Sequence, residues 1–416
     1  MSNEYQTADA TLYIKKGEGR TLRAGGLWVY DNEVDHIEGS YADGDILAVR
    51  DARGAFRGWG CISDNSRLRV RILSRREEDP VTPALLRRRV LDAWDYRKRV
   101  MARPEDLAAC RLIFGEADLL PGITVDRFSD VLVMESLARG TDRFKQIICQ
   151  ALLEILAAEG IQIRMIYERS DARVRTLEGL ERVKGPLYTA QDGSGDPVVE
   201  IVENGVRYHV DVENGQKTGF FLDQKYNRQA IRTLARDGRV LDCFTHTGAF
   251  ALNAVMAGAR EVWAVDASDT GIAQARENAA LNGCLDRMRF ETADVFELLP
   301  ALEAQGETFD LVILDPPAFT KSRASVKKAT AGYREINLRG LRLVRDGGFL
   351  ATCSCSHFME PALFARTISE AARDAHVRLR QVEYRTQAPD HPILWMDGSG
   401  TETSYYLKFY IFQVLR

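Results

Sequence analysis

The strongest constraint on the fold is the regular alternation of short apolar strands and helices from about residue 238 onward. Short loops between such elements are typical of a parallel sheet with helices on both faces. The pattern predicts strands at 239–243, 261–265, 288–293, 309–314, 348–354, 377–386 and 404–414. Helices are expected between them, at about 248–258, 268–281, 295–304, 328–344 and 360–375. Because no helix separates the last two strands, the sheet should have seven strands and end in a hairpin.

An acidic residue stands at the carboxyl end of each of the first four predicted strands. These residues are Asp242, Asp266, Asp294 and Asp315. Open α/β sheets bind ligands beyond the carboxyl ends of their strands, so we expect the four carboxyl groups to face one cleft. The alternative for any one of them is that it only caps the following helix.

The first turn of this region, residues 242–250, lacks the three glycines of a pyrophosphate-binding loop. A cofactor without phosphate needs only Gly248 for close backbone approach and an acid 24 residues after Asp242 for ribose hydroxyls. S-adenosylmethionine (SAM) fits this description, with Asp266 at the ribose and Asp294 near the adenine amine. Upstream, residues 217–224 place two aromatic side chains beside a glycine and a polar pair, although this segment could equally be a core strand with a helix cap. The predicted cofactor residues are Phe220, Asp223, Gln224, Asp242, Phe244, Thr247, Gly248, Asp266 and Asp294.

The fourth strand runs into the segment Asp315–Phe319, DPPAF. Two prolines fix the backbone so that Asp315 points into the cleft, and Phe319 can stack on a planar ring. We therefore predict substrate contacts at Pro316, Pro317 and Phe319. The simpler interpretation of the two prolines is a stiff turn.

Two cysteines lie near the end of the fifth strand, in TCSCSH at 352–357. Cys353 is expected to be a buried, inert side chain, whereas Cys355 lies beyond the apolar run, near a helix start that would favour its thiolate. A thiolate that adds to carbon 6 of a pyrimidine makes carbon 5 nucleophilic enough to attack the methyl group of SAM. Asp315 would hold the ring edge, and His357 is one candidate for the base that removes the carbon-5 proton. A paired base would have to be flipped out, or the target would have to be single-stranded.

Overall charge argues against nucleic acid as a partner, but its distribution does not. The chain has 56 basic and 60 acidic residues, a net charge of −4. Residues 67–103 contain twelve basic and five acidic residues, so this window carries +7 and the other residues carry −11. Arg67, Arg69 and Arg71 alternate along a predicted strand and are candidate RNA contacts, since phosphate binding depends on local charge. The alternative is a solvated arginine-rich surface.

Composition and turn signals indicate three domains. Residues 11–74 read as short strands, 83–103 as a basic amphipathic helix, and 110–200 as an α+β region ending in the turn-rich segment 191–197. Within that region we expect an irregular segment at 111–130, strands at 131–135 and 165–169, and a helix at about 143–158. We predict domains at 1–78, 79–199 and 200–416. There is no apolar run of membrane-spanning length or signal-like N-terminus, and the seven cysteines form no metal-type spacing. These features predict a cytoplasmic protein without a metal or a membrane partner.

Several segments together resemble one family, the bacterial class I 23S rRNA methyltransferases that carry an N-terminal PUA domain and act at carbon 5 of cytosine. The segments are LRAGGLWVY at 22–30, GEADLLPGITVDR at 115–127, ERSD at 168–171, and the segments 217–224, 242–250, 315–319 and 354–356. The resemblance implies an α/β fold: a β-rich PUA domain, a middle α+β domain and a Rossmann-like seven-stranded class I methyltransferase domain. It also implies Cys355 as nucleophile and a possible homodimer. Position 318 is Ala where many RNA cytosine-C5 enzymes have a second cysteine, which leaves Cys355 as the sole nucleophile.

The expected function is therefore SAM-dependent formation of 5-methylcytosine in large-subunit rRNA. Guanine-N2 or uridine-C5 methylation of rRNA is the alternative within the enzyme class. Outside that class, the chain could be a ribosome-assembly factor that binds SAM without catalysis.

Overall fold

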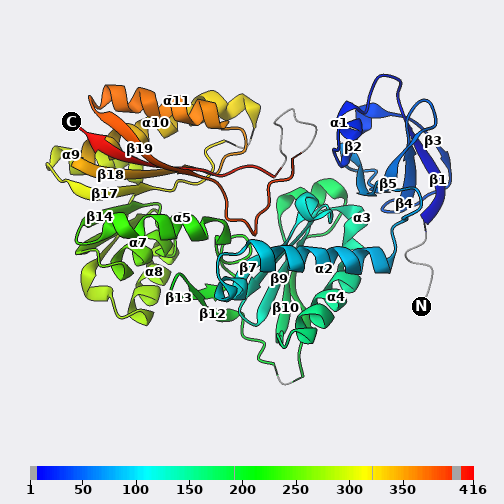
Figure 1. Cartoon of the computed structure of the whole chain (residues 1–416), viewed down its shortest axis with the longest axis horizontal. Coiled ribbons are helices and arrows are strands. Elements are labelled where there is room, and N and C mark those ends of the chain that lie inside the picture. The colour runs from blue at the N-terminus through cyan, green and yellow to red at the C-terminus, as the bar shows by residue number, and fades with distance from the viewer. Residues whose placement is uncertain (1–6, 192, 321, 396–403) are drawn as a thin grey trace. The chain divides into compact units, whose positions relative to one another are not determined.

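The computed structural model describes residues 7–191, 193–320, 322–395 and 404–416 (Figure 1). The chain forms two compact units. The first contains residues up to Ile201 together with Val210–Leu222 and Pro389–Ser404. The second contains Val202–His209, Asp223–Ala388 and Tyr405–Arg416. The predicted division at 1–78, 79–199 and 200–416 stays a prediction.

The first unit begins with a six-stranded sheet of strand order β2-β6-β5-β4-β1-β3. Its strands are β1 (Thr7–Ile14), β2 (Trp28–Tyr30), β3 (Val34–Gly39), β4 (Ile46–Arg50), β5 (Phe56–Ile62) and β6 (Leu68–Ser74), and the short helix α1 (Arg20–Arg23) follows β1. Apolar side chains on one side of these strands, such as Leu12, Val49 and Ile72, form a common core. This is the small β module that the sequence predicts, with α1 as an addition.

A second sheet in the same unit has the order β11-β10-β9-β8-β7. The strands are β7 (Ala109–Phe114), β8 (Ile123–Phe128), β9 (Val131–Ser136), β10 (Met165–Ser170) and β11 (Val183–Thr189). The helices α2 (Pro83–Val100), α3 (Arg139–Asp142) and α4 (Lys145–Ala158) accompany it. Thr82 caps α2 by accepting a hydrogen bond from the Leu85 amide at 3.2 Å, and Pro83 occupies the first helical position.

The two sheets of the first unit are held together by close packing and by a buried ion pair. Arg71 on β6 contacts Glu178 through two hydrogen bonds of 2.7 and 3.1 Å, and both side chains are largely buried. Gly140 on α3 lies so close to Cys61 on β5 that an added Cβ atom would come within 2.0 Å of the Cys61 Cβ. A larger residue at position 140 would therefore force the sheets apart.

The second unit is built around a seven-stranded sheet of order β16-β15-β14-β17-β18-β20-β19 (Figure 1). Its strands are β14 (Arg239–Cys243), β15 (Glu261–Asp266), β16 (Met288–Thr292), β17 (Phe309–Leu314), β18 (Val344–Ser354), β19 (Arg378–Arg385) and β20 (Lys408–Leu415). Strand β20 is antiparallel to both of its neighbours, and the others run parallel. The predicted seven strands and terminal hairpin are confirmed.

Helices cover both faces of this sheet (Figure 1). On one side lie α9 (Val295–Ala304), α10 (Val326–Leu343) and α11 (Pro361–Asp374), and on the other α7 (Ala249–Met256) and α8 (Asp269–Leu281). The helices α5 (Lys225–Ala230) and α6 (Arg232–Ala235) precede β14. Because the central parallel strands are covered on both faces, they contain continuous buried apolar runs, as in Leu311–Leu314.

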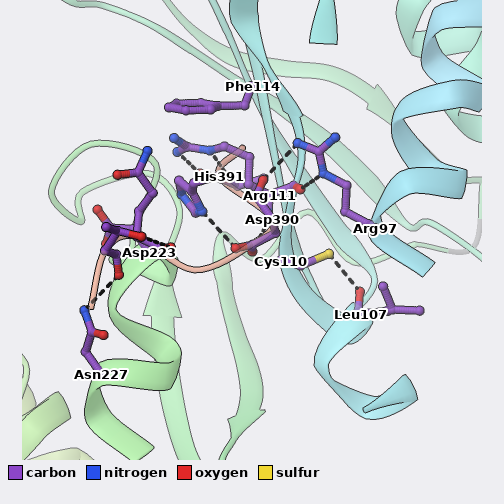
Figure 2. A network of polar contacts seen from close by, with 12 residues as sticks. Arg97, Leu107, Cys110, Arg111, Phe114, Asp223, Asn227, Asp390 and His391 are labelled. Carbon is purple, nitrogen blue, oxygen red and sulfur yellow. Dashed lines mark hydrogen bonds and ion pairs between the residues drawn. The ribbon is translucent and has the colours of Figure 1, made fainter. Parts of the chain in front are cut away.

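The connection between β19 and β20 leaves the second unit and returns to it. Its part Pro389–Ser404 belongs to the first unit, where Asp390 and His391 are buried. Arg97 donates to the Asp390 carbonyl at 2.9 Å, and the Arg111 amide donates to the Asp390 carboxylate at 2.9 Å (Figure 2). The His391 ring packs edge-on against Phe114. The sequence indicates only a loop here.

Sequence reasoning did not resolve several strands of the middle region. It predicted β9, α4 and β10, but read β7 and β8 as one irregular segment and gave no separate place to β11. The hairpin β12 (Val198–Glu203) and β13 (Val206–Asp211) was also missed.

Candidate active site

The loop after β14 is shaped by three left-handed residues. Phe244, His246 and Gly248 have φ angles of 63°, 52° and 83°. Asp242 at the end of β14 accepts hydrogen bonds from the Thr245 hydroxyl at 2.6 Å and the Ala251 amide at 2.9 Å. Such a backbone is costly for side chains other than glycine, and the bonds to Asp242 offset part of that cost.

Asp266, at the end of β15, holds the same loop from its other side. Its carboxylate accepts hydrogen bonds from the His246 amide at 2.8 Å and the Ser268 amide at 2.9 Å. Two of the acids predicted from the sequence thus fix the first loop, one on each side.

The acids at the strand ends influence one another. Burial, together with the negative charges of Asp315 and Asp266, raises the pKa of Asp242 to about 7. Burial and the charge of Asp223 raise the pKa of Asp315 to about 7. The structure therefore brings three of the four predicted strand-end acids, Asp242, Asp266 and Asp315, into one electrostatic environment, which Asp223 joins.

Asp294 differs from the other three acids. Its side chain is exposed and accepts a hydrogen bond from the Phe296 amide at 2.8 Å, which caps α9. This is the helix-capping role that the sequence left open as the alternative for each acid.

The polar atoms at the first loop suit SAM. Oδ1 of the fully buried Asp242 and Oγ1 of Thr247 have no hydrogen-bond partner among the residues that the structure describes. An unpaired buried carboxylate oxygen is costly and can accept a bond from the ammonium group of a methionine moiety. The Asp266 carboxylate has further lone pairs for ribose hydroxyls. Gly248 has no side chain, and an added Cβ atom at this position would lie 3.1 Å from the Ala275 Cβ. The backbone here therefore stays accessible to a ligand.

Gln224 anchors Asp315 from the segment before the sheet. Its Nε2 donates to Oδ1 of Asp315 at 3.0 Å and lies 3.5 Å from the Cys353 sulfur. The Asn227 side-chain amide donates to Oε1 of Gln224 at 2.6 Å, which fixes the orientation of the Gln224 amide. Asp223 accepts a hydrogen bond from the Tyr406 hydroxyl at 2.7 Å. Of the predicted cofactor residues, Phe220 belongs to the first unit, whereas Asp223 and Gln224 belong to the second.

Cys355 is the first residue after β18 and is the one cysteine of seven that is not buried. Its sulfur donates to the Pro316 carbonyl at 3.8 Å, so it lies beside the DPPAF segment. The helix start that was expected to favour its thiolate is six residues away, because α11 begins at Pro361. Burial raises the pKa of Cys353 well above its usual value and makes this thiol unreactive.

Lys408 and Tyr333 hold the Cys355 segment and were missed by sequence reasoning. The buried Lys408 ammonium donates to the carbonyls of Ser356 at 2.7 Å and Tyr406 at 2.8 Å. Burial lowers the pKa of Lys408 to about 8, while the proximity of Cys355 acts in the opposite direction. The Tyr333 hydroxyl lies 3.0 Å from the hydroxyls of both Ser354 and Ser356. Lys408 could have been noticed because it is a lysine in an otherwise apolar strand. Nothing in the sequence around Tyr333 indicates its role.

The other predicted substrate residues occupy different environments. Pro316 is buried, Pro317 is exposed, and Phe319 packs on Tyr333 with ring centroids 4.6 Å apart. His357 is exposed, and its Nδ1 lies 3.3 Å from the Tyr405 carbonyl oxygen.

The three arginines predicted to bind RNA lie in the first unit and differ in their contacts. Arg67 is exposed. Arg69 contacts Asp64 at 2.9 Å, and Arg71 is committed to Glu178. Arg71 therefore stabilises the packing of the two sheets.

Among the described residues, no cluster of three or more His, Cys, Asp or Glu side chains could hold a metal ion. In the same part of the chain, no helix combines the length and apolar character needed to cross a membrane.

Comparisons with known proteins show the family and the fold. Residues 162–400 match the family of S-adenosylmethionine-dependent methyltransferases, and residues 12–75 match the PUA-like domain family. A protein from Streptococcus mutans, described as a SAM-dependent methyltransferase, has the same fold, with a TM-score of 0.79 and 20% identity over 97% of this chain and 99% of that one. A methyltransferase crystallised with S-adenosylhomocysteine has a TM-score of 0.80, with the same identity and coverage.

Fold and site together define a SAM-dependent methyltransferase with an N-terminal PUA-like domain. Two curated relatives share more of the sequence, and both are named ribosomal RNA large subunit methyltransferase I. The one from Aeromonas salmonicida is 38% identical over 95% of this chain and 97% of its own length, and the one from Tolumonas auensis is 37% identical over 96% and 98%. This chain belongs to the ribosomal RNA large subunit methyltransferase I family.

Proposed function

We propose that this protein methylates carbon 5 of a cytosine in large-subunit ribosomal RNA through a covalent bond from Cys355 to the base. The observation that carries the proposal is the position of Cys355. It is partly exposed at the carboxyl end of β18, and its sulfur lies 3.8 Å from the carbonyl of Pro316 in the DPPAF segment. The names of the relatives supply the rRNA substrate of the proposal.

The proposed reaction uses Cys355 in its first and last steps. The Cys355 thiolate adds to carbon 6, which breaks the 5,6 double bond and moves electrons through carbon 4 onto N3, where a protonated carboxyl can stabilise them. Carbon 5 then becomes the nucleophile, and bound SAM supplies the methyl group. A base removes the carbon-5 proton, the double bond re-forms, and the carbon–sulfur bond breaks to release the thiolate.

Asp315 suits the recognition of cytosine. With its pKa raised to about 7, the carboxyl group is protonated in a large fraction of molecules at neutral pH. A protonated carboxyl can donate to N3 of cytosine and accept from the N4 amine. Gln224 donates to Asp315 Oδ1, and the Cys353 thiol also hydrogen-bonds with this carboxyl group, so two neighbours fix its orientation. In uridine, N3 carries a proton, so only the ionised form of the same acid could accept from it.

A trapping experiment tests the proposal. RNA containing 5-fluorocytidine should form a stable covalent complex with the wild-type protein in the presence of SAM, because fluorine cannot leave as a proton does. Cys355→Ala should abolish the complex. Cys353→Ala is the matched control, since this neighbouring thiol is fully buried, and it should keep the complex.

Other outcomes identify the alternatives. Methyl transfer that survives Cys355→Ala would contradict the covalent mechanism and favour methylation of a guanine amine. Trapping by 5-fluorouridine RNA alone would favour uridine. Binding of SAM without any transfer would favour an assembly factor. Nucleoside mapping of rRNA from cells with and without the protein should show the loss of one 5-methylcytosine, and an unchanged rRNA would contradict the proposal.

A further inference from the structure

A second cleft lies in the first unit, between the β1–β6 sheet and α2. Its volume is about 740 Å³. Four separate stretches of chain form most of its walls: the turn after α1, the end of β6, one side of α2, and Leu394 with Trp395 from the connection between β19 and β20. We call this the arginine cleft.

The arginine cleft carries a positive charge. Five arginines and two aspartates line it: Arg23, Arg75, Arg76, Arg88, Arg89, Asp79 and Asp92. Arg88 contacts Asp79 at 2.8 Å. Arg75 donates to the carbonyls of Leu22 and Gly26, and Arg89 donates to the carbonyl of Leu119. Within the described part of the chain, Arg23, Arg75, Arg76 and Arg89 form no ion pair, so their charges remain available to an anion.

Trp395 adds an aromatic surface to the rim of the arginine cleft. Its side chain is 73% exposed, more than that of any other large hydrophobic residue described. The residue before it is held in place: the Leu394 amide donates to the Ser404 hydroxyl at 2.7 Å, and its side chain packs against the core of the β1–β6 sheet. Exposure of a large apolar ring to solvent is unfavourable, and the anchored backbone keeps the indole exposed. A flat partner stacked on the ring would cover this apolar surface.

We propose that the arginine cleft binds a single-stranded segment of the RNA substrate, with one base stacked on Trp395 and the adjacent phosphates at Arg76 and Arg23. Exposed aromatic rings beside cations are the general means of binding single strands, because every base has a flat face and every nucleotide has a phosphate. A duplex keeps its bases stacked inside and would not reach the indole. The inference rests on the proposed function only in taking RNA as the ligand.

Fluorescence of the full-length protein tests the inference directly. The chain has five tryptophans, of which Trp94 and Trp263 are buried. An unstructured ten-nucleotide RNA should quench the fluorescence of the wild type. Trp395→Phe should lose most of the quenching but keep the affinity, measured by anisotropy of labelled RNA, within about threefold. Trp395→Ala should weaken binding about tenfold or more, the low-to-middle range for loss of one stacked base.

Salt dependence tests the arginines. Arg76→Ala should weaken binding and reduce the slope of log affinity against log salt by about 0.7, the value for one phosphate contact on a single strand. Arg366→Ala is the control, because this arginine on α11 is 76% exposed and lies outside the cleft. It should leave affinity and slope unchanged.

Three outcomes would overturn the inference: wild-type affinity in Trp395→Ala, undiminished quenching in Trp395→Phe, or equal binding of duplex RNA. Competition by an acidic peptide that matches the single-stranded RNA would also overturn it and would assign the cleft to a protein partner. These failures are distinct from failure of the proposed function, because trapping at Cys355 does not depend on Trp395. Conversely, oligonucleotide binding can succeed even if no cytosine is trapped.

Discussion

The carboxyl group of Asp315 couples the proposed chemistry to pH. Because its pKa is about 7, the protonated form that would donate to cytosine N3 disappears as the pH rises through 7. We expect kcat/KM of the wild type for rRNA to fall as the pH rises through 7, which gives the pH profile a descending alkaline limb. Asp315→Asn carries an amide that donates at every pH, so this limb should flatten while the maximum falls about tenfold, roughly 1.4 kcal/mol. Rates measured between pH 5.5 and 8.5 check this.

The same residue gives a second readout in stability. The pKa of Asp315 is raised from its usual value near 3.8, so the folded state binds more protons than the unfolded state between about pH 4 and 7. The contribution of this group to the free energy of unfolding is therefore present below pH 4 and is lost as the pH rises toward 7. Asp315→Asn should remove that part of the pH dependence. An identical activity limb in both proteins would contradict the assigned role.

The first loop of the sheet depends on a glycine at the start of α7. Gly248 has a φ of 83°, and a Cβ there would lie 3.1 Å from the Ala275 Cβ. Gly248→Ala should lower the free energy of unfolding by about 1–2 kcal/mol, the cost of a left-handed alanine, and should weaken SAM binding. Calorimetric titration with SAM and chemical denaturation measure the two effects.

The other end of α7 provides the control. Gly258 also has a left-handed φ, of 98°, but an added Cβ there makes only an ordinary contact, 3.8 Å from Arg236 Cγ. Gly258→Ala should lose similar stability and keep its affinity for SAM. If both variants lose SAM binding equally, the effect of Gly248 is one of stability alone.

Helices and strands with a clear periodic pattern of apolar residues could be predicted from the sequence. Contacts between elements that are distant in the chain could not. The strands β14 and β17 begin and end where the sequence predicts, because each is a buried apolar run followed by an acid. The strands β7 and β8 were missed, since they mix charged and apolar residues. Asp242, Asp315 and Cys355 were found from strand ends. Lys408 and Asn227 were not, because their roles arise from folding segments that are far apart in the chain.

At the scale of the whole molecule, net charge was a poor guide to binding, and so was the local excess of arginine. Several arginines of the 67–103 window are used in structure: Arg71 pairs with Glu178, and the fully buried Arg97 pairs with Asp118. Such pairs need acids from other segments, which sequence order does not reveal. The unpaired charge of this window is smaller than +7, and Arg75, Arg76 and Arg89 at the arginine cleft carry part of it.

The stability of the first unit should depend on Asp390, a residue that lies between two strands of the second. Asp390→Ala leaves the Arg111 amide without its carboxylate partner, and an unsatisfied buried donor costs about 1–3 kcal/mol. Hydrogen exchange should speed up in β7 and in residues 389–395, but not in β14. Asp346 is the control, since it also accepts a backbone bond, from Arg416 at 2.9 Å, but is exposed. Uniform acceleration across both units would contradict this local effect.

The path of the backbone between the two units has a consequence for how such a protein can arise and be divided. The chain passes from one unit to the other at five places: after residues 201, 209, 222, 388 and 404. No single break in the polypeptide releases either unit intact. A single end-to-end fusion of two genes could therefore not join these two units. At least one of the two fragments produced by one cut always contains segments of both units.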